Sequence, residues 1–505
     1  AHSMLRSIII LLRLLSPAQQ KRLFILQILV VLMSIAEVVG VTSIGPFMAL
    51  VGDATILSEN NLLSELYEFS GLTKPEDFIF WLGTSVLILL ALGTLVSMLT
   101  FWRLSLFAQE TGMEIGNRLF NYYIYQPWLF HTSESSAKLI KQIATETSRV
   151  TFGIITPLMH LNARLIMVVS MSIAIYVYNP TVMISALAIF GSAYLVLYNL
   201  VKGKLTKLGQ NISIGNWQRF KLMSEGFGGI KDVLLLGRQK GFTEPFESSG
   251  KTLSYSVATD LTLVQVPRYF MELVAYGAVI FLILYLNKSS DGNLSSVLPI
   301  LAIYCMAGLK LLPVFQTTYG CIATIRGSLP AFEAIKKDLE ANQSNIERQE
   351  SRRQTQEHVT VNQCIKLENI EFTYPGKEIP ALAQFNIEIP IGKVIGLVGL
   401  SGSGKSTAID ILLGLIKPDK GQLLLDGRPL KSAQTRAWQN IMGFVPQSIF
   451  LSDATIMENI AFGFPANEIN SERVLEVARL ARLEDLIKEL PNGLNTILGE
   501  RGVQL

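Results

Sequence analysis

Nine consecutive residues in the second half of the chain have the types and spacing of a phosphate-binding loop. The sequence GLSGSGKST at 399–407 fits the pattern G-x-x-x-x-G-K-[ST], and it follows the apolar run 394–398, which predicts a short strand. Glycines let backbone N–H groups close around phosphate oxygens, and the start of a helix predicted for 408–415 adds positive potential. We expect Lys405 to neutralise the β- and γ-phosphates of ATP and Ser406 to coordinate Mg²⁺.

Three further features surround this loop. Tyr374 follows the predicted strand 370–373, and Gln447 lies in the segment FVPQSIFL at 444–451, after a run that predicts another strand. Near the end of the chain comes LGERG at 498–502. Strand-type runs alternate with helical ones here, as in an α/β domain. Each feature alone is an ordinary strand-end or loop residue, but their order around the loop favours a nucleotide-binding domain.

Asp426 imitates the acidic end of a strand, because it follows the apolar run 423–425. Gly427 comes directly after it, however, and Asp-Gly between two short strands is a signal for a hairpin turn. We therefore assign Asp426 no catalytic role.

The composition indicates that long segments of the chain are surrounded by lipid rather than by water. Of 505 residues, 50% are hydrophobic and only 16% are charged, whereas soluble proteins carry about 25% charged residues. The net charge of +3 is too small to indicate a nucleic-acid partner. The three cysteines form no C-x-x-C pair, so the sequence predicts neither a disulfide framework nor a zinc site. Residues 1–3 precede Met4 and are interpreted as an expression scar.

Apolar runs predict six membrane spans, because crossing the hydrocarbon core takes about 20 apolar residues. Asn179-Pro180 is a turn signal that makes the third and fourth spans a tight hairpin. The predicted spans are 23–50, 78–102, 165–178, 181–200, 266–286 and 297–314.

Basic residues between the spans predict the orientation. The stretches 103–150 and 201–260 contain five and nine Lys or Arg, whereas 52–77, 179–180 and 287–296 contain only Lys74 and Lys288. We therefore expect both termini, the long loops and the nucleotide domain in the cytoplasm. The expected order is an interfacial elbow helix at 4–22, a six-span domain at 23–337 with an external amphipathic helix at about 58–70, a polar linker at 338–362, and a partial nucleotide domain at 363–505.

Together these features resemble the nucleotide-binding domain of ABC exporters. The resemblance implies an all-α six-helix membrane domain of the type IV exporter kind, followed by an α/β phosphate-loop domain. It implies that Tyr374 stacks on adenine and that Gln447 contacts Mg²⁺ and the hydrolytic water, as a catalytic residue. The residues expected to hold the nucleotide are Tyr374, Gly399, Ser401, Gly402, Ser403, Gly404, Lys405, Ser406 and Thr407.

The membrane half is similar to one subgroup, the lipid-linked oligosaccharide flippases of bacterial protein N-glycosylation. This resemblance rests on GGIKDVLLLGR at 228–238, on Pro267-Arg268 with Glu272, and on LKLLP at 309–313. Since one six-span unit and one nucleotide domain make half a transporter, it implies a homodimer in the bacterial inner membrane that flips a polyprenyl-pyrophosphate oligosaccharide outward. The alternatives are an exporter of lipid A type or of hydrophobic drugs, and a non-transport ABC-fold membrane factor.

Charged residues within the spans are substrate candidates, because placing a charge in hydrocarbon is costly. One interpretation is that Arg268 and Lys310 face a cavity and bind the pyrophosphate. The other is that Arg268 pairs with Glu272 one turn away and that Lys310 reaches the cytoplasmic headgroups. Glu37 could pair with either cation across helices.

The external helix allows two interpretations as well. Leu62, Leu63, Leu66, Tyr67 and Phe69 recur at helical spacing on one side. The helix either packs on its own spans or lies on the outer membrane surface, where the leucines contact lipid or a lipidic substrate.

The sequence ends at Leu505, near the point at which the signature sequence of the family would begin. The resemblance therefore implies that the Walker B aspartate, the catalytic glutamate and the switch histidine belong to the complete protein. We expect this chain by itself to bind nucleotide without steady-state hydrolysis.

Overall fold

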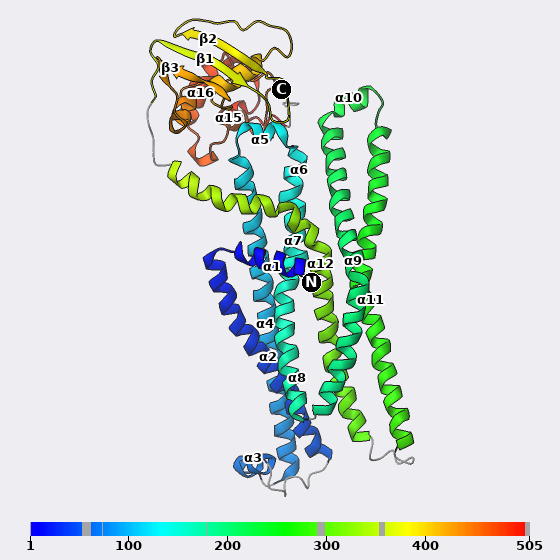
Figure 1. The fold of residues 1–505 in the computed structure, drawn as a ribbon. Coiled ribbons are helices and arrows are strands. Elements are labelled where there is room, and N and C mark those ends of the chain that lie inside the picture. The colour runs from blue at the N-terminus through cyan, green and yellow to red at the C-terminus, as the bar shows by residue number, and fades with distance from the viewer. Residues whose placement is uncertain are drawn as a thin grey trace. The chain divides into compact units, whose positions relative to one another are not determined.

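Two units of unlike secondary structure make up the protein, seen in a computed structural model that describes residues 2–52, 62–72, 74–178, 180–289, 298–352 and 359–499. Contacts between Cα atoms divide the chain into Ala1–Thr355 and Gln356–Leu505. The first unit is a set of long helices, and the second contains a small sheet with short helices (Figure 1).

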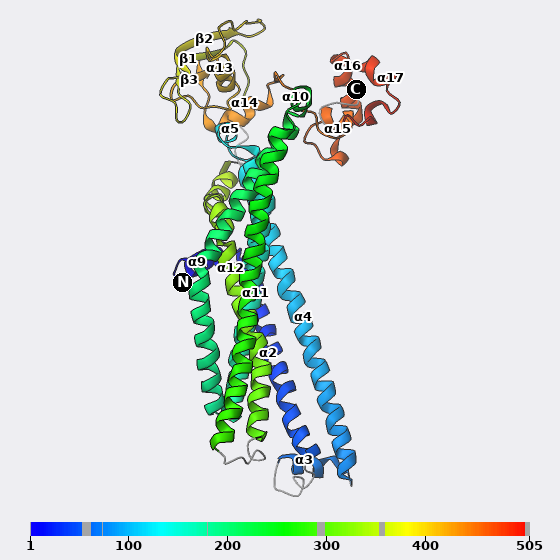
Figure 2. The same cartoon turned by 90° about the vertical axis from the view of Figure 1, so that its right-hand side faces the viewer.

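Six long helices of the first unit contain the predicted spans, apart from Val297, which lies outside the described residues. A membrane supplies no hydrogen-bond partners, so apolar segments satisfy their backbone groups within a helix. The described helices are α1 (His2–Arg13), α2 (Pro17–Gly52), α3 (Leu62–Ser70), α4 (Pro75–Ile124), α5 (Trp128–Ser133), α6 (Ser136–Lys141), α7 (Thr147–Val150), α8 (Thr156–Tyr178), α9 (Pro180–Gly228), α10 (Ile230–Leu235), α11 (Lys240–Ser289) and α12 (Leu298–Arg352). Figure 2 shows that α2, α4, α9, α11 and α12 run roughly side by side along the length of this unit.

Length and hydropathy alone identify three described helical segments as able to cross a membrane: Pro17–Ile44, Pro75–Ile124 and Ser136–Ser170. Their apolar stretches have mean hydropathies of 2.5, 2.3 and 1.5. The predicted hairpin turn falls between α8 and α9, and Asn179 lies outside the described residues. Helical structure continues through the first part of the predicted linker, because α12 ends only at Arg352.

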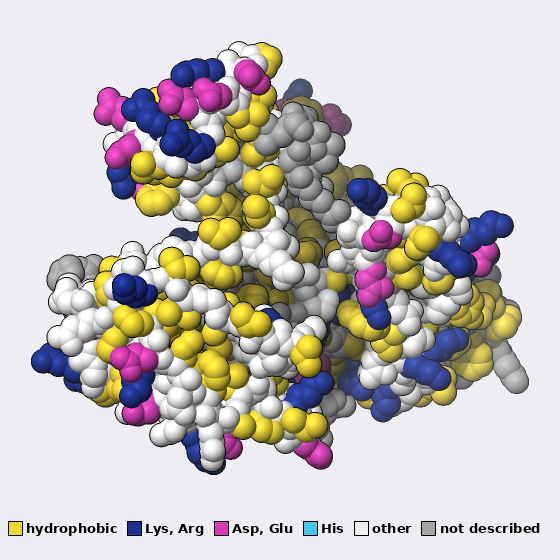
Figure 3. Space-filling model, turned by 90° about the horizontal axis from the view of Figure 1, so that it is seen from above, with side chains coloured by type: hydrophobic (Ala, Val, Ile, Leu, Met, Phe, Trp, Pro, Cys, Tyr) yellow, Lys and Arg dark blue, Asp and Glu magenta, His cyan; other side chains and the backbone are white. Residues whose placement is uncertain are grey.

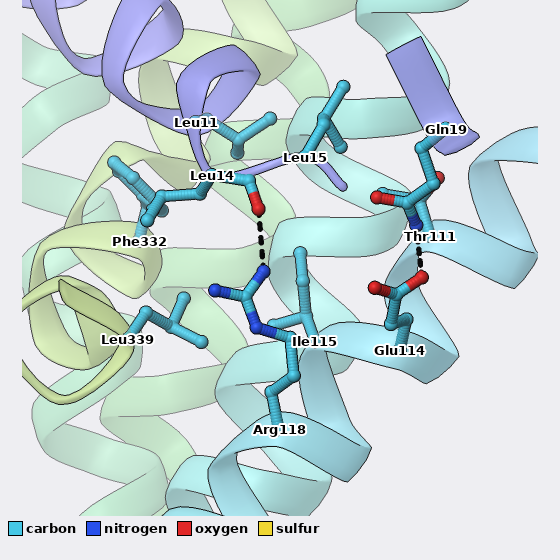
Figure 4. Close-up of a pocket in the computed structure, with 10 residues that line it drawn as sticks. All are labelled: Leu11, Leu14, Leu15, Gln19, Thr111, Glu114, Ile115, Arg118, Phe332 and Leu339. Carbon is cyan, nitrogen blue, oxygen red and sulfur yellow. Dashed lines mark hydrogen bonds between the residues drawn. The ribbon is translucent and has the colours of Figure 1, made fainter. Parts of the chain in front are cut away.

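The N-terminal helix docks on α4 and α12 by its apolar side. Leu11 is 3% exposed and belongs to the same buried cluster as the α12 side chains. The chain then turns at 14–16 into α2, and Figure 4 shows how this turn is fixed: Arg118 of α4 donates to the Leu14 carbonyl, and Gln19 donates to Glu114 at 2.6 Å. A cavity of about 10 Å³ remains between these side chains. Residues 17–22 of the predicted elbow helix therefore belong to α2.

One buried cluster of the helical unit lies where α4, the segment 150–163 and α12 meet, and it extends onto α1 and α2. Each of its large apolar side chains contributes about 1.5–3 kcal/mol when fully buried. Members that are at most 2% exposed include Leu104, Leu119, Ile154, Ile155, Ile325, Phe332, Ile335 and Leu339.

The sheet of the second unit is antiparallel, with strand order β2-β1-β3-β4. The helices α15, α16 and α17 pack on one another. The elements are β1 (Cys364–Phe372), β2 (Leu382–Pro390), α13 (Lys405–Leu412), β3 (Lys420–Leu425), β4 (Arg428–Pro429), α14 (Thr435–Asn440), α15 (Ile456–Ile460), α16 (Ser471–Leu480) and α17 (Glu484–Glu489).

Two strands predicted beside the nucleotide motifs are wrong. The run 394–398 and the run before Gln447 belong to no strand of the described sheet. Val394 and Val398 are 99% and 98% exposed, so their apolar side chains gain nothing from burial here. A strand forms only where a neighbouring strand completes its hydrogen bonds, and no described strand pairs with either run.

The hairpin prediction for Asp426 is confirmed, since β3 and β4 pair as Leu425 with Arg428 around Asp426-Gly427. Asp426 has φ +47, and its carboxylate accepts the backbone N–H groups of Asn362, Gln363 and Cys364 at 2.8–2.9 Å. These donors favour the ionised form and lower the pKa of the Asp426 carboxyl, the bond from Asn362 most of all. Asp426 is thus a structural clamp between the hairpin and the start of β1.

Candidate nucleotide site

Backbone geometry at 399–407 is that of a loop turning into a helix. Gly402 and Gly404 have φ of +82 and +87, a region that favours glycine, and Gly404 caps the N-terminus of α13. A Cβ atom at Gly404 would lie 2.5 Å from the Ala381 carbonyl oxygen and 2.7 Å from Leu382 Cδ2. Both the backbone conformation and the available space therefore require glycine at position 404. The first N–H groups of α13 have no partner within the helix, so they are free to bind an anion at the loop.

The Lys405 side chain folds back onto its own loop. Its Nζ atom donates to the carbonyls of Gly399 at 2.8 Å and Leu400 at 2.7 Å. Two neutral carbonyls are weaker acceptors for an ammonium group than a phosphate is. The lysine is therefore held where an anion entering the loop meets it, and binding a phosphate exchanges two hydrogen bonds to uncharged carbonyls for bonds to an anion.

Tyr374 is brought to the phosphate-loop helix. Its hydroxyl lies 3.1 Å from Thr407 Oγ1, and its half-buried ring packs edge-on against Phe372 with centroids 5.0 Å apart. Asp419 accepts the N–H of Thr373 at 2.8 Å and so fixes the backbone just before the tyrosine. Stacking of this ring on adenine stays a prediction. Asp419 was not among the predicted residues, although the preceding proline marks a turn.

Ser401, Ser403 and Ser406 are exposed at the loop surface, where their hydroxyls are available to a ligand. Gln447 is also exposed, and among the described residues no hydrogen bond joins it to 399–407. Its predicted contact with Mg²⁺ and water stays a prediction, as does metal binding by Ser406. In the LGERG sequence, 500–502 lie outside the described residues.

The segment after Gln447 is fixed by a local network. Thr455 caps α15 by accepting the Glu458 N–H at 3.2 Å, and Glu458 accepts the Thr455 N–H at 2.9 Å. The Thr455 hydroxyl and N–H lower the pKa of the Glu458 carboxyl. Asn459 accepts the N–H of Ser452 at 2.9 Å and donates to its carbonyl at 3.1 Å. These hydrogen bonds fix the chain from Ser452 to Asn459.

Two of the charged substrate candidates have partners among the described residues. Arg268 Nε donates to Glu272 Oε1 at 3.1 Å, as the interpretation of an ion pair within the helix predicts. The arginine side chain is 58% exposed. Glu37 Oε1 accepts the Ser97 hydroxyl of α4 at 2.8 Å, and among the described residues no ion pair joins it to Arg268. Lys310 lies on α12, and its side chain is outside the described residues.

The predicted external helix forms as α3, and 58–61 lie outside the described residues, as does the side chain of Leu62. The apolar residues do not share one environment. Leu66 and Phe69 are 45% and 92% exposed, whereas Tyr67 packs against Phe78 of α4 with centroids 5.1 Å apart. Leu63 is half-buried. The helix is therefore anchored by its tyrosine and presents other apolar side chains outward.

Comparison with known proteins identifies both units. Residues 42–307 match the ABC transporter transmembrane region family, and residues 382–501 match the ABC transporter family. The ATP-dependent lipid A-core flippases of Salmonella typhimurium and Escherichia coli (strain K12) are each 25% identical over 92% of this chain and 80% of their own length.

A solved structure of a bacterial Atm1-family ABC exporter with ATP bound has the same fold. Its TM-score is 0.72 at 18% identity, over 97% of this chain and 82% of that one. The predicted fold class, a type IV exporter membrane domain followed by a nucleotide-binding domain, is thereby confirmed. Since the transmembrane-region match alone covers just over half of the chain, this multi-pass membrane protein with its ATP-binding, ATPase domain belongs to the ABC transporters, as an exporter half-transporter.

Proposed function

We propose that the protein uses ATP to flip a phosphorylated glycolipid outward across the bacterial inner membrane, and that this lipid is a polyprenyl-pyrophosphate oligosaccharide. The observation that carries the general proposal is the similarity to lipid A-core flippases over 92% of the chain. Lipid A and polyprenyl-pyrophosphate oligosaccharides share long apolar chains, phosphate charge and sugars. The similarity to those flippases makes lipid A the second candidate substrate.

The catalytic unit we propose is a homodimer that binds ATP with Mg²⁺. Lys405 would neutralise the β- and γ-phosphates, Ser406 and Gln447 would hold the metal ion, and Tyr374 would stack on adenine. In support, the loop glycines, Lys405 and the Tyr374–Thr407 contact all lie around the start of α13. A metal ion there offsets charge that develops on the transferred phosphoryl group.

We place the nucleotide unit and both termini in the cytoplasm. Fourteen Lys or Arg in 103–150 and 201–260, against two in the opposite loops, support this orientation. Figure 3 views the end of the first unit at which α10 lies, where Lys and Arg side chains lie among Asp, Glu and apolar ones.

The polyprenyl choice is supported by α3. Leu66 and Phe69 are exposed on a short helix between the first two spans, with Glu65 and Glu68 also exposed. A helix of this kind lies in the membrane interface with its apolar side toward the acyl chains. A long polyprenyl tail that remains in the membrane while its head group crosses would meet this surface.

The substrate is tested with the transporter reconstituted in liposomes. Fluorescent polyprenyl-pyrophosphate oligosaccharide, fluorescent lipid A and a hydrophobic drug are compared for ATP-dependent flipping and for stimulation of ATP hydrolysis. We expect the first to be flipped at least tenfold faster than the others. Faster flipping of lipid A would select the second candidate, and no flipping of either lipid would refute the glycolipid proposal.

Arg268 is tested together with Lys310, since either cation can compensate for the other. Changing both to Gln should reduce flipping at least tenfold if they receive the pyrophosphate. Glu272→Gln separates the two interpretations. It leaves flipping intact if Arg268 binds substrate, and reduces it as Arg268→Gln does if only the Arg268–Glu272 pair matters. Lys251→Gln, in an exposed pair of the same helix spacing, is the control.

The external helix is tested by changing Leu62, Leu63 and Leu66 to Ser. If these residues contact the lipid tail, flipping per ATP hydrolysed should fall about tenfold, because an interfacial helix loses affinity with its apolar area. Glu65→Ser, on the same helix, is the control. A parallel collapse of flipping and hydrolysis would mean that α3 only stabilises the fold.

A further inference from the structure

A charged cluster is buried in the helical unit, away from the substrate candidates. The Glu146 side chain has no exposed surface, and its two carboxylate oxygens lie 2.9 Å from Lys141 Nζ and 3.1 Å from Arg149 Nη1. Lys141 and Arg149 are themselves 9% and 17% exposed. Burying charges is costly, and apolar residues of similar volume often stabilise a fold as well. Stability alone is therefore a weak explanation for this cluster.

Arg149 connects this cluster to two other helices. Its Nη1 atom also donates to the Ser213 hydroxyl of α9, and its Nη2 atom donates to the Gly209 carbonyl of α9 at 3.2 Å. Its charge acts on Asp260 of α11 as well. Asp260 Oδ1 is buried without a hydrogen-bond partner among the described residues. Because the guanidinium group is a rigid fork, one side chain holds Glu146 and two sites on α9 in a fixed geometry.

The backbone around Arg149 is unusual. Two π-helical turns, Gln142–Glu146 and Thr151–Ile155, flank the single turn α7 inside a helix that continues from α6 into α8. Such turns are rare and occur often at functional sites. They persist only where surrounding contacts determine them.

Glycines let α4 and α12 approach this segment closely, and they let α9 approach α12 beside it. A Cβ atom at Gly112 of α4 would overlap Thr151, and one at Gly153 would overlap Ser328 of α12. A Cβ atom at Gly209 would overlap the backbone of Gly327. We call 141–155, with these contacts, the hub. It is clamped from several sides, so it can transmit movement from one helix to another.

Along the chain, the hub lies between α5 and the third predicted span. Toward one end, α6 leads to α5, and toward the other, α8 enters the third span. ATP binds in the other unit, so its effect must reach the spans through helix ends outside the membrane. We propose that Arg149 is a positioning residue that couples movement of α5–α8 to α9 and α11. This rests on the proposed ATP-driven transport, but not on the identity of the lipid.

The test is hydrogen–deuterium exchange of the transporter in lipid nanodiscs, with and without ATP and vanadate. Exchange is followed in 399–412, which reports nucleotide binding, and in 203–215 and 255–265, which report α9 and α11. In Arg149→Gln we expect full protection of 399–412 and at least a fivefold loss of the ATP-dependent change in α9 and α11. Arg149→Lys keeps the charge but not the fork, so it should restore part of that change. Arg22→Gln, in an exposed ion pair with Glu110, is the control.

Each outcome is decisive. A wild-type response of α9 and α11 in Arg149→Gln would overturn the proposal, since coupling would then not need the arginine. If Arg149→Gln exchanges faster throughout the first unit without ATP, it has lost its fold, and Arg149→Lys becomes the deciding variant. There, an ATP response in α9 and α11 equal to that of the wild type would overturn the proposal, and a reduced one would support it.

If the wild type protects 399–412 but α9 and α11 never respond, ATP-driven transport fails as well. If α9 and α11 respond to ATP in the Arg149 variants as they do in the wild type, only the proposed role of the hub is refuted.

Discussion

The phosphate loop and the hub are both built around a cation held by several partners, but they are encoded differently. In the loop, Lys405 and the carbonyls that it binds lie within nine consecutive residues, at 399–407. In the hub, Arg149 binds groups of α9 that are separated from it by 60 or more residues. The loop can therefore be recognised in the sequence as a motif, whereas the contacts of the hub form only when the helices pack together.

This difference has a consequence for substitution. A local motif keeps its shape when the rest of the fold is perturbed, because glycine conformations and helix capping maintain it. A distributed cluster depends on close helix approach, so a single added methyl group far from the charges can disturb it. Loop variants should therefore affect chemistry with little change in stability, and hub variants should affect stability and coupling.

The largest effect is expected at the loop. Lys405→Ala should reduce ATP-driven flipping by the complete protein about 10²–10³-fold, the usual cost of removing one preorganised electrostatic contact. The unfolding temperature should remain within a few degrees of the wild type, because the exposed lysine bonds only its own loop. Flipping and thermal unfolding are measured on the same preparation, with Lys393→Ala as the exposed control. Transport at the wild-type rate would overturn the assigned role of the loop.

The intermediate effect is expected at the hub. Gly153→Ala places a Cβ atom against Ser328 and should lower the free energy of unfolding by about 1–3 kcal/mol, as overpacking does. Gly203→Ala on α9 is the matched control, because it is exposed and nothing lies within 4 Å. Alanine is the better helix former there and should stabilise by up to about 1 kcal/mol. Equal effects of the two variants, measured by thermal unfolding in detergent, would show that close packing at the hub is unimportant.

How far sequence could predict the structure follows the same division. The six apolar runs and the positive φ of Gly404 are consequences of local composition, and both were predictable. The absence of a strand at 394–398 could not be predicted, because a strand depends on a neighbour that an apolar run does not specify.

Among charged residues, local spacing was a good guide to some contacts and no guide to others. The Arg268–Glu272 pair is four residues apart and could be anticipated as the alternative to cavity binding. The Glu37–Ser97 hydrogen bond joins α2 and α4, and Arg149–Ser213 joins the hub to α9. Neither has a sequence signal, because helix rotation about its axis decides which side chains meet.

Asp426 is the case between these extremes, and the smallest effect is expected there. Its turn is local, but its three backbone donors lie at 362–364. Because its pKa is lowered in the folded state, ionised Asp426 stabilises the fold above the ordinary aspartate pKa of about 3.9. That contribution is lost as the pH falls through the lower folded pKa. Asp426→Asn keeps the left-handed turn, which asparagine tolerates, but replaces one acceptor oxygen with a donor.

The variant should therefore loosen the start of β1 at neutral pH and cease to matter in acid. Hydrogen exchange of 362–372 is compared between variant and wild type at each pH, so that the intrinsic pH dependence of exchange cancels in the ratio. We expect a ratio of about three to ten at pH 7, equivalent to a loss of one or two backbone hydrogen bonds, that declines toward one as the pH falls through the folded pKa, below the ordinary aspartate value. Asp485→Asn, at an exposed site in α17, should give a ratio near one throughout. A ratio for Asp426→Asn that stays constant with pH would mean that the carboxylate charge contributes nothing, and that the turn alone holds the hairpin to β1.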